Sequence, residues 1–226
     1  MKVCYSSLTL LFCLIQNTIA QTGTDFNSII QEHIKLLGNL DKTNPPLMLL
    51  FSATPGMGKT TIATKIAAAL SALKITVDDA RRLLIQHAIP MQGQRRYQDL
   101  SIEEKIACIV EYLDQFIKEI RKISGNRFII IDDTINQWYG QIQRIADKHA
   151  MPTFLIRLVV SKATACERIR EREANPQEYL ASMDHWYQLY ENFNAGPFDY
   201  LFCNEHKFDE KQFQELLSLL KSTVLC

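Results

Sequence analysis

A phosphate-binding loop is predicted at Ala53-Thr54-Pro55-Gly56-Met57-Gly58-Lys59-Thr60-Thr61. In the pattern G-x-x-x-x-G-K-[ST], small residues let successive backbone N–H groups curl around phosphates, and a following helix N-terminus adds partial positive charge. The lysine, here Lys59, reaches the β- and γ-phosphates, and the hydroxyl of Thr60 is placed to hold Mg²⁺. Ala53 stands where the first glycine belongs, and Gly56 supplies extra backbone freedom. The residue types predict a nucleoside triphosphate site bound through residues 54–61.

Carboxylates follow two later apolar segments. Asp78 and Asp79 come directly after residues 73–77, with Arg81 close behind, and Asp132 and Asp133 come after residues 128–131. Ligands of open parallel sheets sit outside the carboxyl ends of the strands, so these acids are expected to face the nucleotide. Side-chain alternation lets only one residue of the second pair face the Mg²⁺ site, and which one it is stays open.

Phosphoryl transfer needs both kinds of group found here. A carboxylate orients and deprotonates the acceptor hydroxyl, and cations offset the charge that develops on the phosphoryl oxygens. The alternative for Asp78 and Asp79 is a structural one, because aspartate is a favoured N-cap of helices.

The elements that must position these groups follow from the apolar patterning. Five apolar segments alternate with segments of helical period, and the phosphate-binding loop lies between the first of them and a strong helix-forming run at 62–70. Strands alternating with helices predict an α/β fold, a three-layer α/β/α sandwich around a five-stranded parallel sheet. The expected strands lie at 46–51, 73–77, 128–131, 152–160 and 198–204.

Strand, Asp-Asp-x-Arg and helix, placed after a phosphate-binding loop, resemble the P-loop kinases of the polynucleotide 5′-hydroxyl kinase and zeta-toxin-like branch. The resemblance covers about residues 46–220 and implies ATP and Mg²⁺ as donor and cofactor. It implies that Asp78 accepts the proton of the acceptor hydroxyl and that Arg81 steadies a phosphate of the acceptor. It also places Asn204, at the end of the last strand, close to the adenine.

The arginine run at 168–172 resembles the lid of the same kinases, expected at about 165–176. The resemblance implies that Arg172 stabilises the transferring phosphoryl group, and Arg168 is the next best match. Arginine suits this role because its planar fork spreads charge over phosphate oxygens. Every-second spacing cannot put all three arginines on one face of a helix, so the run must partly unwind or divide its roles. The alternative is a helix held by Glu/Arg pairs.

Composition limits the classes of function. The chain has 226 residues, 47% of them hydrophobic, which favours one domain with a substantial core. Lys plus Arg equal Asp plus Glu at 25 each, which argues against a protein that coats nucleic acid or membrane by charge alone. The aromatic residues of 176–194 are expected to pack in the core, although a stacking surface is an alternative. Cys108 and Cys203 are expected on apolar faces, as small core residues.

Residues 1–20 have the layout of a secretory signal peptide or hydrophobic leader. Lys2 precedes an apolar stretch at 8–15, and Ala20 ends the segment before Gln21. The apolar stretch is too short to span a bilayer, so no membrane span is expected in the mature chain. This predicts an exported protein that works in a host or target cell, the alternative being a cytoplasmic one. Residues 21–45 are expected to form an N-terminal helix and a linker, and 46–226 the kinase domain.

The leading hypothesis is transfer of the γ-phosphate of ATP to a hydroxyl acceptor, with Lys59, Asp78, Arg81, Arg168 and Arg172 as catalytic residues. The acceptor is a nucleic-acid end, a nucleotide sugar or a small molecule. The alternative is a nucleotide-binding switch or slow ATPase that acts through a protein partner.

Overall fold

The computed structural model describes residues 30–32, 34, 46–86, 97–123, 128–193, 196–206 and 208–225. The predicted leader lies outside these residues. Of the predicted N-terminal helix, residues 30–32 and 34 are described and are helical. Among the described residues, no helix has the length and apolarity needed to cross a membrane.

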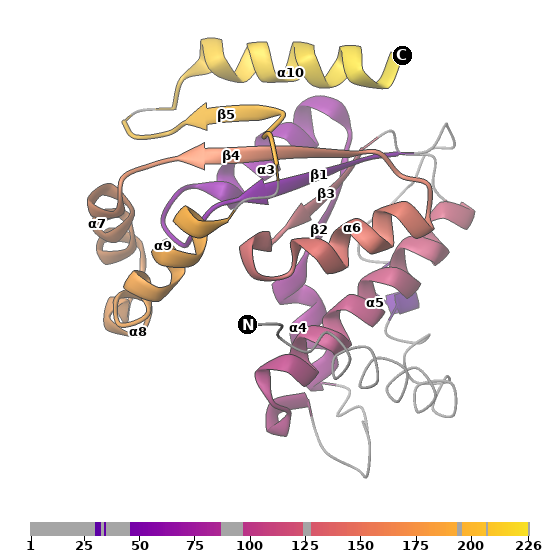
Figure 1. The fold of residues 1–226 in the computed structure, drawn as a ribbon, viewed down its shortest axis with the longest axis horizontal. Coiled ribbons are helices and arrows are strands. Elements are labelled where there is room, and N and C mark those ends of the chain that lie inside the picture. The colour runs from indigo at the N-terminus through magenta and orange to yellow at the C-terminus, as the bar shows by residue number, and fades with distance from the viewer. Residues whose placement is uncertain are drawn as a thin grey trace, which may run out of the picture. The chain divides into compact units, whose positions relative to one another are not determined.

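The chain divides into two compact units, residues 1–40 with 77–123 and residues 41–76 with 124–226. The second unit contains a five-stranded, all-parallel sheet, which confirms the predicted α/β fold (Figure 1). The strand order is β2-β3-β1-β4-β5. The strands are β1 Leu47–Ser52, β2 Leu73–Thr76, β3 Phe128–Asp132, β4 Thr153–Val159 and β5 Tyr200–Cys203.

The central strand β1 explains why the sheet is parallel and buried. All six of its residues are buried, and it pairs with β3 on one side and β4 on the other. Leu49 lies opposite Ile130 in β3 and Phe154 in β4. A strand covered on both faces reads as a continuous apolar run, which is what the segment at 46–51 shows.

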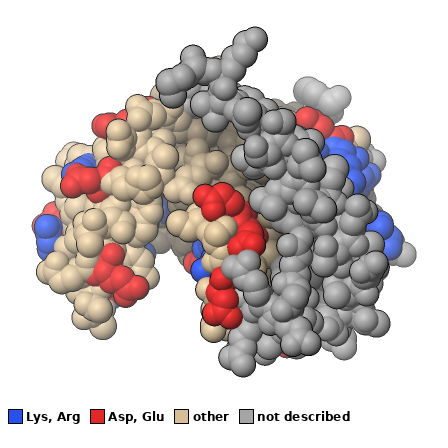
Figure 2. Space-filling view, turned by 60° about the horizontal axis from the view of Figure 1, so that its bottom comes forward, with Lys and Arg blue, Asp and Glu red and all other residues tan. Residues whose placement is uncertain are grey.

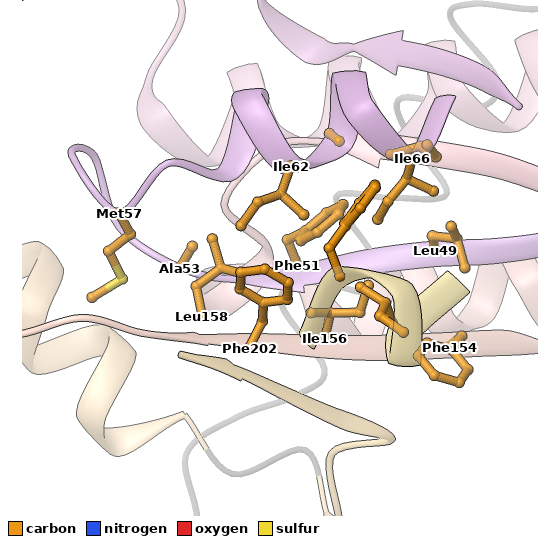
Figure 3. Packing of buried hydrophobic residues seen from close by; sticks show 14 of the residues in the cluster. Leu49, Phe51, Ala53, Met57, Ile62, Ile66, Phe154, Ile156, Leu158 and Phe202 are labelled. Carbon is orange, nitrogen blue, oxygen red and sulfur yellow. The ribbon is translucent and has the colours of Figure 1, made fainter. Parts of the chain in front are cut away.

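One face of the sheet packs against α3 (Lys59–Leu70) and α10 (Glu210–Leu225). Figure 3 shows the centre of this core, where Phe51, Ile156 and Phe202 of three strands meet Ile62 and Ile66 of α3. Residues on the opposite face of β1, such as Met48 and Leu50, are also fully buried, so that face is covered as well. The layers are those expected of an α/β/α sandwich.

The remaining helices of this unit connect the strands, and two short helices separated by residues 181–182 cover the aromatic segment that begins at 176. They are η2 Ile135–Gln137, α6 Tyr139–Lys148, α7 Lys162–Arg172, α8 Pro176–Leu180 and α9 Met183–Asn192. The aromatic residues of α8 and α9 pack on the core, which confirms that expectation. The hydroxyls of Tyr187 and Tyr190 donate hydrogen bonds to the carbonyls of Val160 and Leu158, at 2.6 and 2.7 Å.

The first unit contains α4 (Val77–Gln86), η1 (Tyr97–Asp99) and α5 (Ile102–Ile123). A capping box begins α5: the backbone N–H of Glu104 donates to Ser101 Oγ at 3.2 Å, and Glu104 Oε2 accepts from the N–H of Ser101 at 2.7 Å. Tyr112 and Phe116 of α5 are fully buried and stack at 5.7 Å between ring centroids. The buried apolar side chains along α5 give this helix a structural role.

The cysteines follow the expectation in one case and not in the other. Cys108 is buried in α5, and burial raises the pKa of its thiol to about 12. The prediction for Cys203 is wrong: its side chain is exposed, because alternation along β5 turns Phe202 into the core and the residues on either side of it outward.

Candidate nucleotide-binding site

The loop between β1 and α3 has two glycines with left-handed backbone. Gly56 has φ of 83° and Gly58, the N-cap of α3, has φ of 88°. A Cβ added at Gly56 would lie 2.3 Å from the carbonyl oxygen of Ala165 in α7, so only glycine fits there. Ala53, in place of the pattern's first glycine, is fully buried and has no positive φ, so its position does not require glycine.

Hydrogen bonds from distant elements hold the loop in shape. Asn204, at the end of β5, donates from Nδ2 to the carbonyl of Met57 at 2.8 Å, and Asn136 of η2 donates from Nδ2 to the carbonyl of Ala53 at 2.9 Å. The N–H of Met57 donates to the carbonyl of Thr54 at 3.3 Å, which closes a turn around Pro55. Met57 itself is fully buried, and Figure 3 shows it at the loop end of the buried cluster. The loop is therefore braced at its beginning and at its middle.

Asn204 lies against the loop, as a residue of a nucleotide site would. A Cβ on Gly58 would lie 2.5 Å from Asn204 Nδ2, and the Asn204 side chain is buried. Its amide is already engaged by the Met57 carbonyl, so its observed role is to fix the loop backbone. Contact with an adenine stays a prediction.

Asp132, the last residue of β3, gathers the reactive side chains of the loop around it. Its Oδ1 forms an ion pair with Lys59 and accepts a hydrogen bond from the Thr60 hydroxyl at 3.3 Å, and its Oδ2 pairs with Lys74 of β2 at 3.3 Å. The Asp132 side chain is only 1% exposed. Asp133 points elsewhere, and its Oδ1 accepts from the N–H of Thr134 at 2.7 Å. Asp132 is therefore the acid that faces the loop.

This arrangement fits a Mg²⁺–nucleotide complex. The Thr60 hydroxyl and the Asp132 carboxylate are hard oxygen donors, which Mg²⁺ prefers, and Mg²⁺ takes its other ligands from waters and substrate phosphates. Thr60 and Thr61 are exposed at the start of α3, whose N-terminal N–H groups attract anions. In the sheet, the connection from β1 to β2 runs toward one edge and the connection from β3 to β4 runs toward the other. The carboxyl ends of β1 and β3 therefore flank the point where the strand order reverses, which is where ligands of open α/β sheets bind.

The arginines of α7 divide their roles, because the helix is continuous from Lys162 to Arg172. Arg168 donates from Nη2 to the carbonyls of Asn204, Glu205 and His206, at 2.7, 3.3 and 3.1 Å. Arg172 lies at the end of the helix and pairs with Glu173 at 2.6 Å. Arg168 thus binds the segment after β5, and phosphoryl contacts for either arginine stay predictions.

The N-terminus of α7 is bound to the same segment by Glu205. Its carboxylate accepts hydrogen bonds from the Ser161 N–H and hydroxyl, at 2.5 and 2.6 Å, and from the Thr164 hydroxyl at 2.6 Å. These donors favour the charged form and lower the pKa of Glu205 to about 2. Glu205 and Arg168 therefore bind the N-terminus and the second half of α7 to the segment 204–206, whose Asn204 braces the loop.

Asp78 and Arg81 lie in the other compact unit, in the first turns of α4. Asp78 Oδ1 accepts from Arg81 Nη1 at 2.7 Å, and Asp79 pairs in the same way with Arg82 at 2.6 Å. The Asp78 side chain is 80% exposed. α4 begins at Val77, directly after β2, so both acids lie within its first turn and neither occupies its N-cap. Their roles in phosphoryl transfer stay predictions.

Lys74 is the residue of this cluster that the sequence prediction missed. A lysine inside a short strand reads as a solvent-facing position. The register of β2 against β3 pairs Lys74 with Ile130 and Thr76 with Asp132, so Lys74 shares a face with Asp132 two residues further on. Strand pairing is the signal that would have identified it.

Comparisons with known proteins agree with this architecture. A family model described as an AAA domain matches residues 48–195. Among solved structures, Kti12 of Chaetomium thermophilum with ADP-AlF3 is similar with a TM-score of 0.52 and 20% identity, over 79% of this chain and 99% of that one. The Mycobacterium tuberculosis APS kinase CysC with AMPPNP and APS has a TM-score of 0.51 and 14% identity, over 78% and 98%. No curated protein matches the chain. At such identities the structural likeness establishes a common fold.

Proposed function

The chain belongs to the AAA-domain family, which its residues 48–195 match, and on that premise we propose that it is a kinase that transfers the γ-phosphate of ATP to a hydroxyl group. The observation that carries the proposal is the meeting of Lys59, Thr60 and Asp132 at the start of α3. A lysine, a hydroxyl and a carboxylate beside a glycine loop are the groups that bind the phosphates and Mg²⁺ of a nucleoside triphosphate.

Each residue of this cluster has a distinct task in the proposed site. The N–H groups of the loop and of the first turn of α3 bind phosphate oxygens, and Lys59 binds the β- and γ-phosphates. Thr60 and Asp132 would hold Mg²⁺, which when bound neutralises phosphate charge. The braces from Asn204 and Asn136 keep the loop in its binding shape, so little ordering is needed when the nucleotide arrives.

In the proposed transfer step, Asp78 is the base that accepts the proton of the acceptor hydroxyl. The acceptor oxygen bonds to the γ-phosphorus while the bond from that phosphorus to the β,γ-bridging oxygen breaks, and ADP leaves. The acceptor proton passes to the Asp78 carboxylate, and Arg81 steadies a phosphate of the acceptor. Both assignments rest on the resemblance of Asp-Asp-x-Arg to the polynucleotide 5′-hydroxyl kinase and zeta-toxin-like branch.

The Asp78→Asn variant tests this assignment. It is expected to bind the ATP analogue AMPPNP as the wild type does and to lose phosphoryl transfer. Asp79→Asn is the matched control, because Asp79 makes the same kind of pair with an arginine one residue further along α4. Unchanged turnover of Asp78→Asn, or equal loss in both variants, would remove Asp78 from the role of base.

The acceptor is to be identified by transfer of labelled γ-phosphate. The panel contains RNA and DNA 5′ ends, nucleotide sugars and small hydroxylated molecules. On the face shown in Figure 2, the described Lys and Arg side chains occur in small separate groups with Asp and Glu among them. The equal numbers of Lys plus Arg and of Asp plus Glu in the chain, 25 each, likewise give no support to an acceptor bound along a broad basic surface.

One observation favours the second candidate, a nucleotide-binding switch or slow ATPase that acts through a protein partner. Arg168 donates to three carbonyls and Arg172 pairs with Glu173, so the polar partners described for these two arginines lie outside the loop. Release of phosphate to water that no acceptor in the panel changes would support the switch. Labelled product on any acceptor would exclude it as the main activity.

We further propose that residues 1–20 direct export, so that the kinase works in a host or target cell. Expression of the full chain, followed by mass measurement of the product in the medium and in the cells, tests the leader. An exported product that begins near Gln21 is expected, and an uncleaved product confined to the cells would refute it.

A further inference from the structure

Lys74 is a second cation on a carboxylate that already has one. Its Nζ lies 3.3 Å from Asp132 Oδ2 and donates to Thr64 Oγ1 of α3 at 3.2 Å, while Lys59 pairs with the other oxygen, Oδ1. The side chains of Lys59 and Lys74 are 15% and 24% exposed, against 1% for Asp132. Both ion pairs are therefore largely shielded from water. Charge interactions are stronger in such a shielded site than at the protein surface.

The proposed function creates a problem that Lys74 can solve. Lys59 must bind nucleotide phosphates, yet in this structure it neutralises Asp132. Removing one partner of a buried ion pair is strongly unfavourable, because the remaining charge is left without a partner and without water. A carboxylate with a single lysine would hold that lysine back from the phosphates.

Resting on the proposed kinase function, we propose that Lys74 is a positioning residue, which keeps Asp132 neutralised while Lys59 leaves it for the phosphates of the nucleotide. Because the two lysines use different carboxylate oxygens, Lys59 can depart without displacing Lys74. Lys74 projects from β2, which is paired with β3, so its backbone is held in place independently of Lys59. Asp132 thereby keeps its orientation, and its Oδ1 would be available, together with the Thr60 hydroxyl, to hold Mg²⁺.

Without the Lys74 charge, Lys59 is the remaining cation paired with Asp132 in this cluster, so the ion pair between Lys59 and Asp132 becomes stronger. In Lys74→Met, binding of AMPPNP in EDTA is expected to weaken about tenfold, because the loop lysine must break a stronger ion pair. With excess Mg²⁺, the metal takes part of the carboxylate charge, and the loss is expected to shrink to about threefold or less. A merely structural role for Lys74 would lower affinity equally in both buffers.

Calorimetric titration with AMPPNP in EDTA and in Mg²⁺ measures this difference. Lys74→Arg retains the charge and is expected to bind within about threefold of wild type. Thr64→Val is the matched control, because it removes the hydrogen bond from Lys74 to α3 and leaves the charge. The inference is overturned if Lys74→Met binds as tightly as wild type in EDTA, or if Thr64→Val weakens binding as much as Lys74→Met.

Unfolding without nucleotide gives an independent test. The test is a double-mutant cycle of Lys59→Met and Lys74→Met. In each single variant the remaining lysine still neutralises Asp132, whereas the double variant leaves the carboxylate without a cation. The double variant is therefore expected to lower the folding equilibrium constant at least ~10-fold more than the product of the two single effects. When Asp132→Asn removes the carboxylate, the extra loss in the double variant is expected to disappear. The same background keeps the Lys74→Met protein folded, because no buried charge is left without a partner. Additive effects would overturn the inference. If wild type binds no AMPPNP, the proposed function fails and the cycle alone decides whether Lys74 shares Asp132.

Discussion

The contact between Gly56 and α7 gives a sharp test of the loop geometry. At Gly56 the backbone φ is 83°, and an added Cβ would lie 2.3 Å from the carbonyl oxygen of Ala165. The neighbouring atoms are α7 backbone, which cannot rotate away as a side chain would. Gly56→Ala is therefore expected to destabilise the protein and to weaken AMPPNP binding, since either the loop or α7 must move.

The expected magnitude has two parts. A side chain in left-handed backbone costs about 1–2 kcal/mol. Overpacking against fixed neighbours costs about 1–3 kcal/mol. The sum, about 2–5 kcal/mol, is a large share of the roughly 5–15 kcal/mol that stabilises a typical domain. Urea unfolding followed by far-UV circular dichroism measures the change, and calorimetric titration measures AMPPNP affinity.

Substitutions at two other glycines distinguish the backbone contribution from the overpacking contribution. Gly196 also has positive φ, at 95°, but a Cβ there meets no atom of the described residues within 4 Å, so Gly196→Ala is expected to show the backbone part alone. Gly140, in α6, has open space and no positive φ, so Gly140→Ala is expected to be neutral or stabilising by up to about 1 kcal/mol. If Gly56→Ala is as mild as Gly196→Ala, the close approach of α7 to the loop is refuted.

Three further changes test the elements around the site. Glu205→Gln is expected to lower the unfolding temperature at pH 7. Because folding lowers the pKa of Glu205 to about 2, its charged form stabilises the wild type above about pH 4.5, and this stability is lost as the pH falls toward 2. The unfolding temperatures of wild type and variant are therefore expected to converge near pH 2. Ser101→Ala removes the cap of α5 and is expected to cost about 1 kcal/mol in urea unfolding; no loss would deny the capping box. Tyr190→Phe leaves the carbonyl of Leu158 without its buried donor and is expected to cost about 1–2 kcal/mol, whereas an unchanged midpoint would exclude that hydrogen bond.

The loop, the strands and the helices could be predicted because their signals are local. Gly58, Lys59 and Thr60 are neighbours in the chain, and the run at 46–51 is apolar along its whole length. The same holds for the capping box that begins α5. Such patterns depend on backbone preferences and burial within a few residues, which the sequence displays directly.

What could not be predicted depends on residues far apart in the chain. The choice of Asp132 over Asp133 is decided by which face of β3 lies under α3, and the role of Lys74 by the register of β2 against β3. Arg168 matched a lid arginine by position, yet its partners are carbonyls from Asn204 onward, 36 residues away. No local pattern indicates that those carbonyls need a donor.

The strand order determines when the site can form during synthesis. β1 has β3 and β4 as its neighbours, so residues 47–52 leave the ribosome long before either partner exists. The brace from Asn204 to Met57 arrives later still, because 147 residues separate the two. Pairings this distant close slowly, since the chain between them must first lose conformational freedom. The nascent loop is consequently complete only when nearly the whole protein has been made, and a ribosome-bound chain that ends before residue 204 should lack a finished nucleotide site.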